Sequence, residues 1–259
     1  MIANFHSHTT RCHHATGTER EYIEAAIKQG IKILGFSDHT PQFFYNGYVS
    51  SYRMSVDEVF EYADTVRKLA DEYKNDIKIY LGFETEYFPR EFDKLVKLYE
   101  RVMPDYLLLG QHATNNEYDG FFSTTPTTDV RELKRHVELV KEGLNTGLFS
   151  YLAHPDVLHF IGSDEVYEEY MTDLLSELKR LNLPAEFNFL GFSEHRYYPS
   201  ERYLKIAEKV GNKIIFGIDA HNVSAIENVK QTERAALEFM KPYKLELTDK
   251  IKLLNGEIV

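Results

Sequence analysis

Cysteine, tryptophan and long apolar runs are scarce or absent in this chain of 259 residues. The single cysteine, Cys12, excludes an internal disulfide framework, so a reducing cytoplasm is the expected location. No apolar run is long enough to span a bilayer, and the N-terminal MIANFHSH has neither the basic nor the apolar region of a secretory signal. Because tryptophan is missing, we expect 18 tyrosines and 17 phenylalanines to supply the aromatic side chains of the core and rim.

Positive charge is also in short supply. Lysine and arginine number 30 against 41 aspartates and glutamates, which gives a formal net charge of -11. Such a surface is a poor electrostatic partner for a nucleic-acid backbone or an anionic membrane, so we expect neither partner. If the substrate is an anion, a local cluster of positive charge must reverse the field.

The chain lacks a linker, a low-complexity segment and an internal repeat, so we expect one domain over residues 1–259. Short apolar runs typical of buried strands alternate with longer amphipathic segments typical of helices. Seven such units predict a parallel sheet, either closed into a barrel or open and doubly wound. Residues 244–259 form an extended tail. The expected strands are 2–5, 32–36, 78–83, 105–109, 149–153, 185–189 and 213–218, and the expected helices are 18–30, 55–73, 89–102, 129–144, 164–181, 200–210 and 225–240.

Histidine is crowded at the start of the chain, where four of the 11 histidines fall between His6 and His14. Further polar residues follow the ends of the later strands. Because parallel strands direct their carboxyl ends to one edge, we expect all of these side chains to meet in one cleft. The strand-end residues are His6, His8, Asp38, His39, Glu84, His112, His154, Asp219 and His221.

This set of side chains indicates bound metal. Histidine and carboxylate without a thiolate framework are typical ligands of zinc, manganese or iron, and these ligands leave the choice among the three metals open. His6 and His8 are two residues apart on an extended segment, so both imidazoles point the same way and can bind one ion. The set is too large for one tetrahedral ion, so we expect more than one.

Eight segments in order along the chain carry a resemblance to a known family. The chain resembles the PHP (polymerase and histidinol phosphatase) family, and within it the monofunctional bacterial histidinol-phosphatases, over almost its whole length. The resemblance implies a distorted (β/α)7 barrel, similar to a TIM barrel, with a trinuclear metal site at the carboxyl ends of the strands. The segments are HSHTTRCHHATG from His6, FSDHTP from Phe36, YRM from Tyr52, GFE from Gly82, GQH from Gly110, AHPD from Ala153, FNFLG from Phe187 and GIDAH from Gly217.

The resemblance also assigns ligands to three divalent ions. It implies one ion on His6, His8, Glu84 and Asp219, a second on Glu84, His112 and His154, and a third on His14, His39 and His221. Glu84 would bridge the first two. Spacing alone leaves His13 and His14 open as the ligand, and the C-x-H-A pattern of the family selects His14. Asp38 is expected to orient an imidazole.

Clustered divalent ions can both activate water and offset charge on a phosphoryl group. We therefore expect a hydroxide that bridges the ions at Glu84 to attack phosphorus in one step. A phosphocysteine route is excluded, because it needs a C-x5-R loop and Thr18 stands six residues after Cys12. Cys12 is expected to pack in the core. Three dications against two ligand carboxylates would also supply the positive pocket that the acidic chain otherwise lacks.

Residues that read the substrate are harder to place. Arg53 and Arg196 are candidates to hold phosphate oxygens, although either could be an ordinary surface cation. His195 or Asp219 could protonate the leaving alkoxide. His159 stands where related phosphatases place a lysine and is a candidate phosphate contact. Asn188 is expected either to bind substrate or to stabilise a strand end, and His136 is expected to be solvated on a charged helix.

Together these observations predict a metal-dependent phosphatase that acts on a small phosphate ester. The resemblance implies L-histidinol phosphate as substrate, with L-histidinol and orthophosphate as products in histidine biosynthesis. The alternatives are a phosphoesterase acting on a nucleotide or another small phosphorylated metabolite, and a non-catalytic metal-binding module. The oligomeric state is left open.

Overall fold

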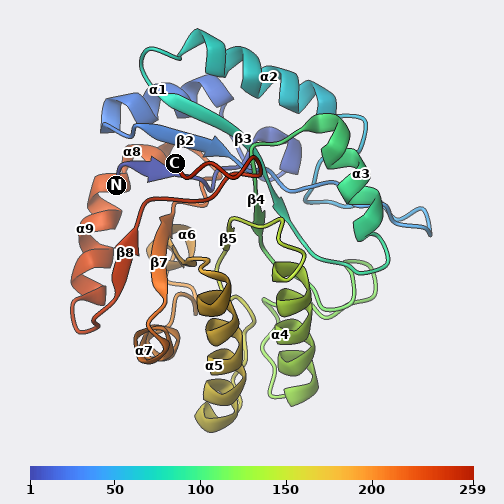
Figure 1. Ribbon diagram of the computed structural model, residues 1–259, viewed down its shortest axis with the longest axis vertical. Coiled ribbons are helices and arrows are strands. Elements are labelled where there is room, and N and C mark those ends of the chain that lie inside the picture. Colours follow the sequence, from blue (N-terminus) through green and yellow to red (C-terminus); the bar gives the residue numbers. More distant parts are fainter.

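The computed structural model of the chain describes residues 1–259. Eight parallel strands form one sheet in the order of the sequence, and the sheet curls so that helices ring its outer side (Figure 1). Every neighbouring pair is parallel, as strand-helix alternation predicts. The strands are β1 (Ala3–Asn4), β2 (Ile33–Phe36), β3 (Lys78–Thr85), β4 (Tyr106–Leu109), β5 (Tyr151–Leu152), β6 (Ala185–Asn188), β7 (Lys213–Gly217) and β8 (Glu246–Thr248).

The helices follow the strands along the chain. The expected capping box at the first of them is present, because the Thr18 side chain accepts from the Glu21 backbone and the Glu21 side chain accepts from the Thr18 backbone. None of the helices combines enough length with enough apolar character to cross a membrane. The α-helices are α1 (Glu19–Gln29), α2 (Val59–Glu72), α3 (Phe92–Val102), α4 (Val130–Leu144), α5 (Asp164–Leu181), α6 (Phe189–Ser193), α7 (Glu201–Val210), α8 (Val223–Glu227) and α9 (Val229–Met240), and a short 3-10 helix covers Thr10–Cys12.

The barrel closes between its first and seventh strands. Ser7 pairs with Ala220 just beyond the carboxyl ends of β1 and β7, and the Asn4 side chain accepts from the Ile218 backbone. The eighth strand extends the sheet beyond β7. The expected distorted barrel of seven strand-helix units is therefore confirmed, and the C-terminal tail, expected only to be extended, adds one more short strand.

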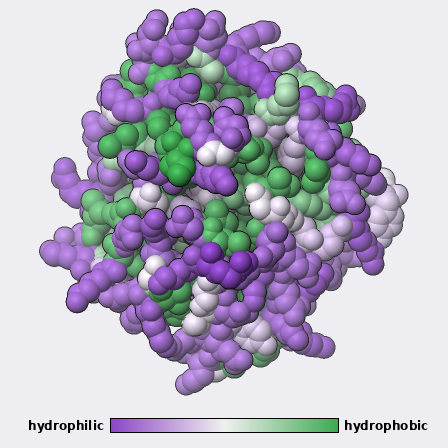
Figure 2. All heavy atoms as spheres, viewed as in Figure 1, coloured by the Kyte–Doolittle hydropathy of each residue, from purple (hydrophilic) through white to green (hydrophobic).

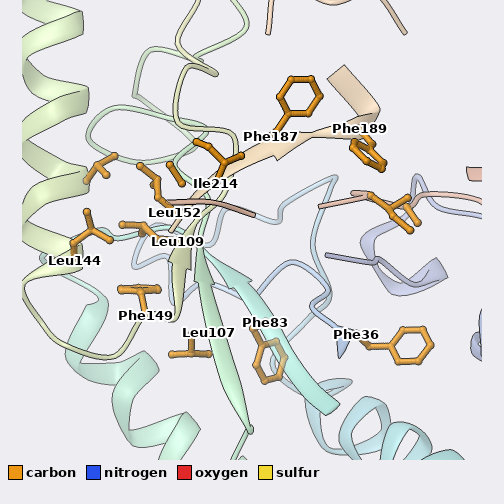
Figure 3. Packing of buried hydrophobic residues seen from close by; sticks show 14 of the residues in the cluster. Phe36, Phe83, Leu107, Leu109, Leu144, Phe149, Leu152, Phe187, Phe189 and Ile214 are labelled. Atoms are coloured by element: carbon orange, nitrogen blue, oxygen red, sulfur yellow. The ribbon is translucent and has the colours of Figure 1, made fainter. Parts of the chain in front are cut away.

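Alternating side chains divide the buried residues into two layers. On β4, Tyr106 and Leu108 belong to a small cluster inside the barrel, whereas Leu107 and Leu109 belong to the large core between strands and helices. Figure 3 shows this outer core, in which Leu109 and Leu152 from neighbouring strands lie near Leu144 of α4. Burial on both faces explains why the strands read as continuous apolar runs.

The tail fills the end of the barrel opposite the histidines. Ile251 and Leu253 join the inner cluster, and the Leu254 backbone donates to the carbonyl of Asp105. Figure 1 shows the C-terminus crossing the middle of the ring, and Figure 2 shows a largely hydrophilic surface around it with hydrophobic residues at its centre. Packing at this end leaves the opposite rim free for function.

Three helices differ from expectation, one of which is the short helix α6, which begins at Phe189 where a strand was expected to end. The expected helix 225–240 divides into α8 and α9 at Asn228, whose side chain donates to the carbonyl of Ser224. The segment before α2 forms a turn, in which the Ser55 backbone donates to Glu58, and the helix begins only at Val59.

His136, expected to be solvated, is 2% exposed, so that expectation was wrong: its face of α4 packs inward.

Candidate metal centre and substrate cavity

The histidines expected at strand ends converge on one cavity of about 730 Å³. The loops after β1 and β7 bring His6, His8 and His221 together, because the Ser7–Ala220 pairing fixes these two loops side by side. His6 and His8 are fully buried beneath the cavity floor. The expected ligands that line the cavity are His14, His39, Glu84, His112, His154, Asp219 and His221.

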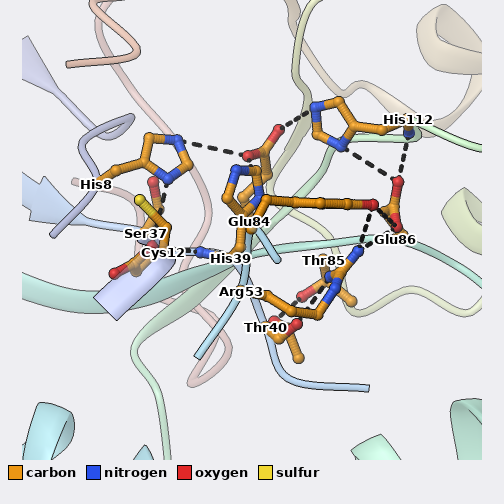
Figure 4. Close-up of polar contacts among 12 residues, drawn as sticks. His8, Cys12, Ser37, His39, Thr40, Arg53, Glu84, Thr85, Glu86 and His112 are labelled. Carbon is orange, nitrogen blue, oxygen red and sulfur yellow. Dashed lines mark hydrogen bonds and ion pairs between the residues drawn. The ribbon is translucent and has the colours of Figure 1, made fainter. Parts of the chain in front are cut away.

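Glu84 on β3 is the centre of the arrangement. Nitrogens of five imidazoles lie 3.5 Å or less from its two carboxylate oxygens, and the side chain is 1% exposed. Figure 4 shows three of them, His8, His39 and His112, around Glu84. Gly110 makes room for it, because a Cβ at that position would lie 2.0 Å from Glu84 Oε1. The five histidines are His6, His8, His39, His112 and His154. The geometry is that of a carboxylate able to bridge two cations.

A second carboxylate, Asp219, lies near the same Nε2 atoms of His6 and His8. Its Oδ1 is 3.1 Å from His8 Nε2 and 3.5 Å from His6 Nε2. The Asp219 backbone is left-handed, with φ of 53°, as is that of His154, with φ of 28°. Non-glycine residues at such φ cost about 1 kcal/mol or more and recur at functional sites, so these two expected ligands are held at the expense of local strain.

The remaining expected ligands form a cluster of imidazoles. His14, His39 and His221 present nitrogens that lie within 4.8 Å of one another. The His14 and His221 rings stack with centroids 4.6 Å apart, and His14 Nδ1 lies 2.7 Å from the carbonyl oxygen of Cys12. The structure therefore brings His14, and not the exposed His13, to the cavity.

Two charge environments shift the imidazole pKa values in opposite directions. Burial lowers the pKa of His6, but the charges of Asp219, Glu186 and Glu84 outweigh burial and hold it well above its usual value. Burial also lowers the pKa of His8, but interactions with Asp219 and Asp38 outweigh burial and raise this pKa to about 9.

In the imidazole cluster, burial lowers the pKa of His221 to about 3, helped by His8, and lowers that of His39 well below its usual value. Within this one cavity, carboxylates outweigh burial at His6 and His8, whereas at His39 and His221 burial and neighbouring imidazoles outweigh the one carboxylate close to each ring.

Several buried atoms of this site have no hydrogen-bond partner. His6 Nε2, His8 Nε2, Asp219 Oδ1 and His221 Nε2 are buried and make no hydrogen bond. Unpaired buried polar groups are costly and rare in folded proteins. Nitrogen and oxygen donors that converge in this way fit divalent cations, and four overlapping groups of such donors are present, with a fifth group that joins His8 and His221 to the Cys12 sulfur.

A shell of carboxylates outside the ligands orients the imidazoles. His6 Nδ1 lies 2.7 Å from Glu186 Oε1, and the other Glu186 oxygen accepts from the His154 backbone and from Asn188. Gly217 leaves the space, since a Cβ there would lie 1.7 Å from Glu186 Oε1. Asp38 lies 3.4 Å from His8 Nδ1, in keeping with its expected orienting position.

Of the residues expected to read substrate, only Arg196 and Asp219 line the cavity. Arg196 is partly exposed, pairs with Glu194 and donates to the hydroxyl of Tyr198. Asn188 is fully buried, where it donates to Glu186 and Asp219 and caps α6. The structure thus favours its strand-end alternative over direct substrate contact.

Three other expected substrate residues do not reach the cavity. His159 stacks on Tyr197 with centroids 3.8 Å apart, and His195 is exposed on the α6–α7 loop. Arg53 is 3% exposed and its guanidinium is paired with Glu86 and Glu117, so the surface-cation reading is wrong and the guanidinium is not directed at substrate.

Sequence reasoning missed three residues of the site. Glu186 and Glu86 contact expected ligands, and Tyr198 lines the cavity. The two glutamates could have been noticed, because each is a charged residue in or directly after an apolar strand, as Glu84 is. Tyr198 gave no such signal among the 18 tyrosines of the chain.

Comparison with known proteins agrees with this geometry. The sequence profile of the PHP domain family matches residues 4–189. The chain belongs to the PHP family. A curated PHP relative from Schizosaccharomyces pombe, described as a probable histidinol-phosphatase, is 31% identical over 251 residues, covering 85% of this chain and 81% of the relative. A protein of the same description from Deinococcus radiodurans is 27% identical over 226 residues, covering 85% of this chain and 86% of its own.

Solved structures confirm the PHP fold. The histidinol phosphate phosphatase of Lactococcus lactis, crystallised with zinc, L-histidinol and phosphate, superposes with a TM-score of 0.70 over 100% of this chain and 98% of its own. Its sequence identity to this chain is 15%, so the likeness is one of fold. The family and fold expected from the ordered segments are both confirmed.

Proposed function

We propose that the chain hydrolyses L-histidinol phosphate to L-histidinol and orthophosphate, using three divalent ions in the cavity. The observation that carries the proposal is the set of unpaired buried nitrogens and oxygens around Glu84, for which bound cations are the partners that fit. The two curated relatives described as probable histidinol-phosphatases support the substrate. So does the zinc, L-histidinol and phosphate in the Lactococcus lactis structure.

The ligand sets follow the donor clusters. His6, His8 and Asp219 form one, His6, Glu84 and His154 another, and His14, His39 and His221 the third. His112 Nε2, 3.5 Å from Glu84 Oε1, completes the second. Bound divalent ions lower the pKa of water to about 7 and neutralise charge on a phosphoryl group. Zinc, manganese and iron all accept these donors.

The chain's own residues then position the substrate and move a proton. Arg196 is the one cavity arginine, and we assign it to the phosphate oxygens. Water attacks phosphorus in line while the bond to the alkoxide oxygen breaks. Asp219, rather than the exposed His195, accepts the proton of the attacking water and returns it to the leaving alkoxide, because Asp219 lies at the cavity floor.

The experiment is orthophosphate release by purified, metal-loaded protein. L-histidinol phosphate is compared with a panel of nucleotides and sugar phosphates, and kcat/KM is measured for each. We expect histidinol phosphate to lead by several orders of magnitude. If another ester leads, the substrate is wrong and the phosphatase chemistry stands, whereas zinc binding without release from any ester would leave a binding module.

A further inference from the structure

The buried Arg53 guanidinium is occupied by the protein itself. Its Nε donates to Glu117 at 2.8 Å, and its Nη1 donates to the carbonyl of Thr40 at 2.8 Å. Its Nη2 donates to Glu86 at 2.6 Å and to the Tyr52 hydroxyl at 2.7 Å. Four of the five N–H groups of the guanidinium are thereby used, so no pair of free N–H groups remains for bidentate binding of a phosphate.

Glu86 connects this arginine to a ligand of the metal centre. One of its oxygens receives the Arg53 bond, and the other accepts from the His112 backbone at 2.6 Å and lies 3.2 Å from His112 Nδ1. Figure 4 shows the chain of contacts from Arg53 through Glu86 to His112. Because Nδ1 faces Glu86, the other ring nitrogen, Nε2, faces Glu84 at 3.5 Å.

This arrangement decides which nitrogen of His112 can bind a cation. A carboxylate beside Nδ1 keeps the proton on that nitrogen, which leaves the lone pair on Nε2. The Glu86 side chain is 1% exposed, and so is that of Arg53, so water does not offer an alternative partner. Arg53 offsets the charge of Glu86 and fixes its rotamer with a guanidinium bond.

We propose that Glu86 and Arg53 are positioning residues of the metal centre, which hold His112 with Nε2 turned to the cation beside Glu84. The inference rests on the metal centre of the proposed function, but not on its substrate. In this proposal Arg53 fixes the position of Glu86, in place of the expected contact with phosphate.

Glu117 offers a matched control within the same cluster. Like Glu86, it is a buried glutamate paired with Arg53, but its second oxygen accepts from the Tyr48 hydroxyl and not from His112. Glu86→Gln and Glu117→Gln therefore each remove one negative partner of Arg53. Only the first also removes the negative charge beside His112 Nδ1.

The test is zinc affinity, measured on metal-stripped full-length protein by competition with a chromophoric chelator. We expect Glu86→Gln to weaken one zinc site by about 10–100-fold, the usual cost of losing such an orienting carboxylate, and Glu117→Gln to stay within about twofold of wild type. In a His112→Ala background, Glu86→Gln should add no further loss. Arg53→Lys, which keeps the charge but not the fork, should weaken the same site by a smaller factor.

Equal losses in the two glutamine variants would overturn the proposal, because they would show that the cluster only anchors its loop. Wild-type affinity in Glu86→Gln, or an undiminished effect of it without His112, would do the same. If Glu86→Gln fails to fold, the comparison between Arg53→Lys and Glu117→Gln decides. Normal zinc binding without histidinol phosphate hydrolysis would defeat the proposed substrate and leave this inference intact.

Discussion

The candidate metal centre has two halves that both contain histidines but differ in their carboxylates. In the carboxylate-rich half, His6 and His8 lie close to both Glu84 and Asp219, and all four are at most 5% exposed. In the imidazole-rich half, nitrogens of His14, His39 and His221 lie within 4.8 Å of one another, and His14 is exposed. The first half offers two buried carboxylates, whereas the second offers imidazoles with lowered pKa values, one of which faces water.

The difference predicts unequal binding of cations. A divalent ion gains most from anionic ligands when water is excluded, because the interaction of charges strengthens as the effective dielectric constant falls. The carboxylate-rich half also has Glu186 behind His6 to fix its geometry. We therefore expect its ions to be retained longest, while the ion of the imidazole-rich half exchanges first.

The largest effect is expected from replacing Glu84, because this change should disrupt both halves of the candidate metal centre. Glu84 contacts histidines of both halves, so Glu84→Gln should lower kcat/KM by about 1000-fold or more and reduce zinc content in both. Phosphate release and elemental analysis measure the two quantities. Glu117→Gln, a buried glutamate outside the site, is the control, and an active Glu84→Gln enzyme would contradict the central position of this carboxylate.

Removing ligands from one half at a time tests the inequality directly. His14→Ala should lose about one zinc per chain and lower kcat/KM by about 100-fold, while the other sites stay filled. His6→Ala should lose zinc from the carboxylate-rich half and be the less active of the two. When the wild type is treated with a mild chelator, the ion of the imidazole-rich half should be lost first, so that the zinc content falls to that of His14→Ala before it falls further. Simultaneous loss of all zinc would show that the halves act as one site.

A third prediction weakens the stronger half without removing a ligand. Glu186→Gln leaves His6 in place but removes the charge at its Nδ1, so zinc affinity there should fall by about 10–100-fold. Gly217→Ala should act in the same direction, because its Cβ would displace the Glu186 carboxylate. Competition with a chelator measures both. Affinity unchanged in either variant would indicate that charge at the ligands alone distinguishes the halves.

The fold and the convergence of the expected ligands on one cavity could be predicted because both depend on local patterns. A parallel strand buried on both faces appears as an apolar run, and its carboxyl end points to the functional rim. The strand β8 gave no such pattern, since its three residues include exposed Glu246 and Leu247. This segment forms a strand because it pairs with β7, and its local sequence pattern does not indicate that pairing.

The substrate residues could not be predicted because their placement depends on contacts far along the chain. Arg53 pairs with Glu86 and Glu117, which are 33 and 64 residues away. An arginine in a loop looks the same whether it faces solvent, a phosphate or a buried carboxylate. His136 was misjudged for a related reason, because charged neighbours in α4 obscured the inward position of its face.

His136 shows what burial does to an imidazole without a paired carboxylate, whereas His39 and His221 of the imidazole-rich half each lie 3.4 Å or less from one. Burial, with added repulsion from His154 and His112, lowers its pKa to about 3, against 6.5 in the unfolded chain. The unfolded state therefore binds more protons below pH 6.5, and stability falls as pH decreases from 6.5 toward 3. At pH 5 the loss is about 2 kcal/mol, from 1.5 pH units at 1.36 kcal/mol each.

His136→Leu should remove this loss, so that the variant gains about 2 kcal/mol relative to wild type between pH 8 and pH 5. Urea unfolding of metal-stripped protein at both pH values measures the difference, with His195→Leu as an exposed control. Taking the difference between variant and wild type removes contributions common to both proteins and leaves that of His136, including its repulsion with His154 and His112. A difference that does not change with pH would mean that burial does not suppress protonation at this site, and that the low pKa values of the imidazole-rich half need another cause.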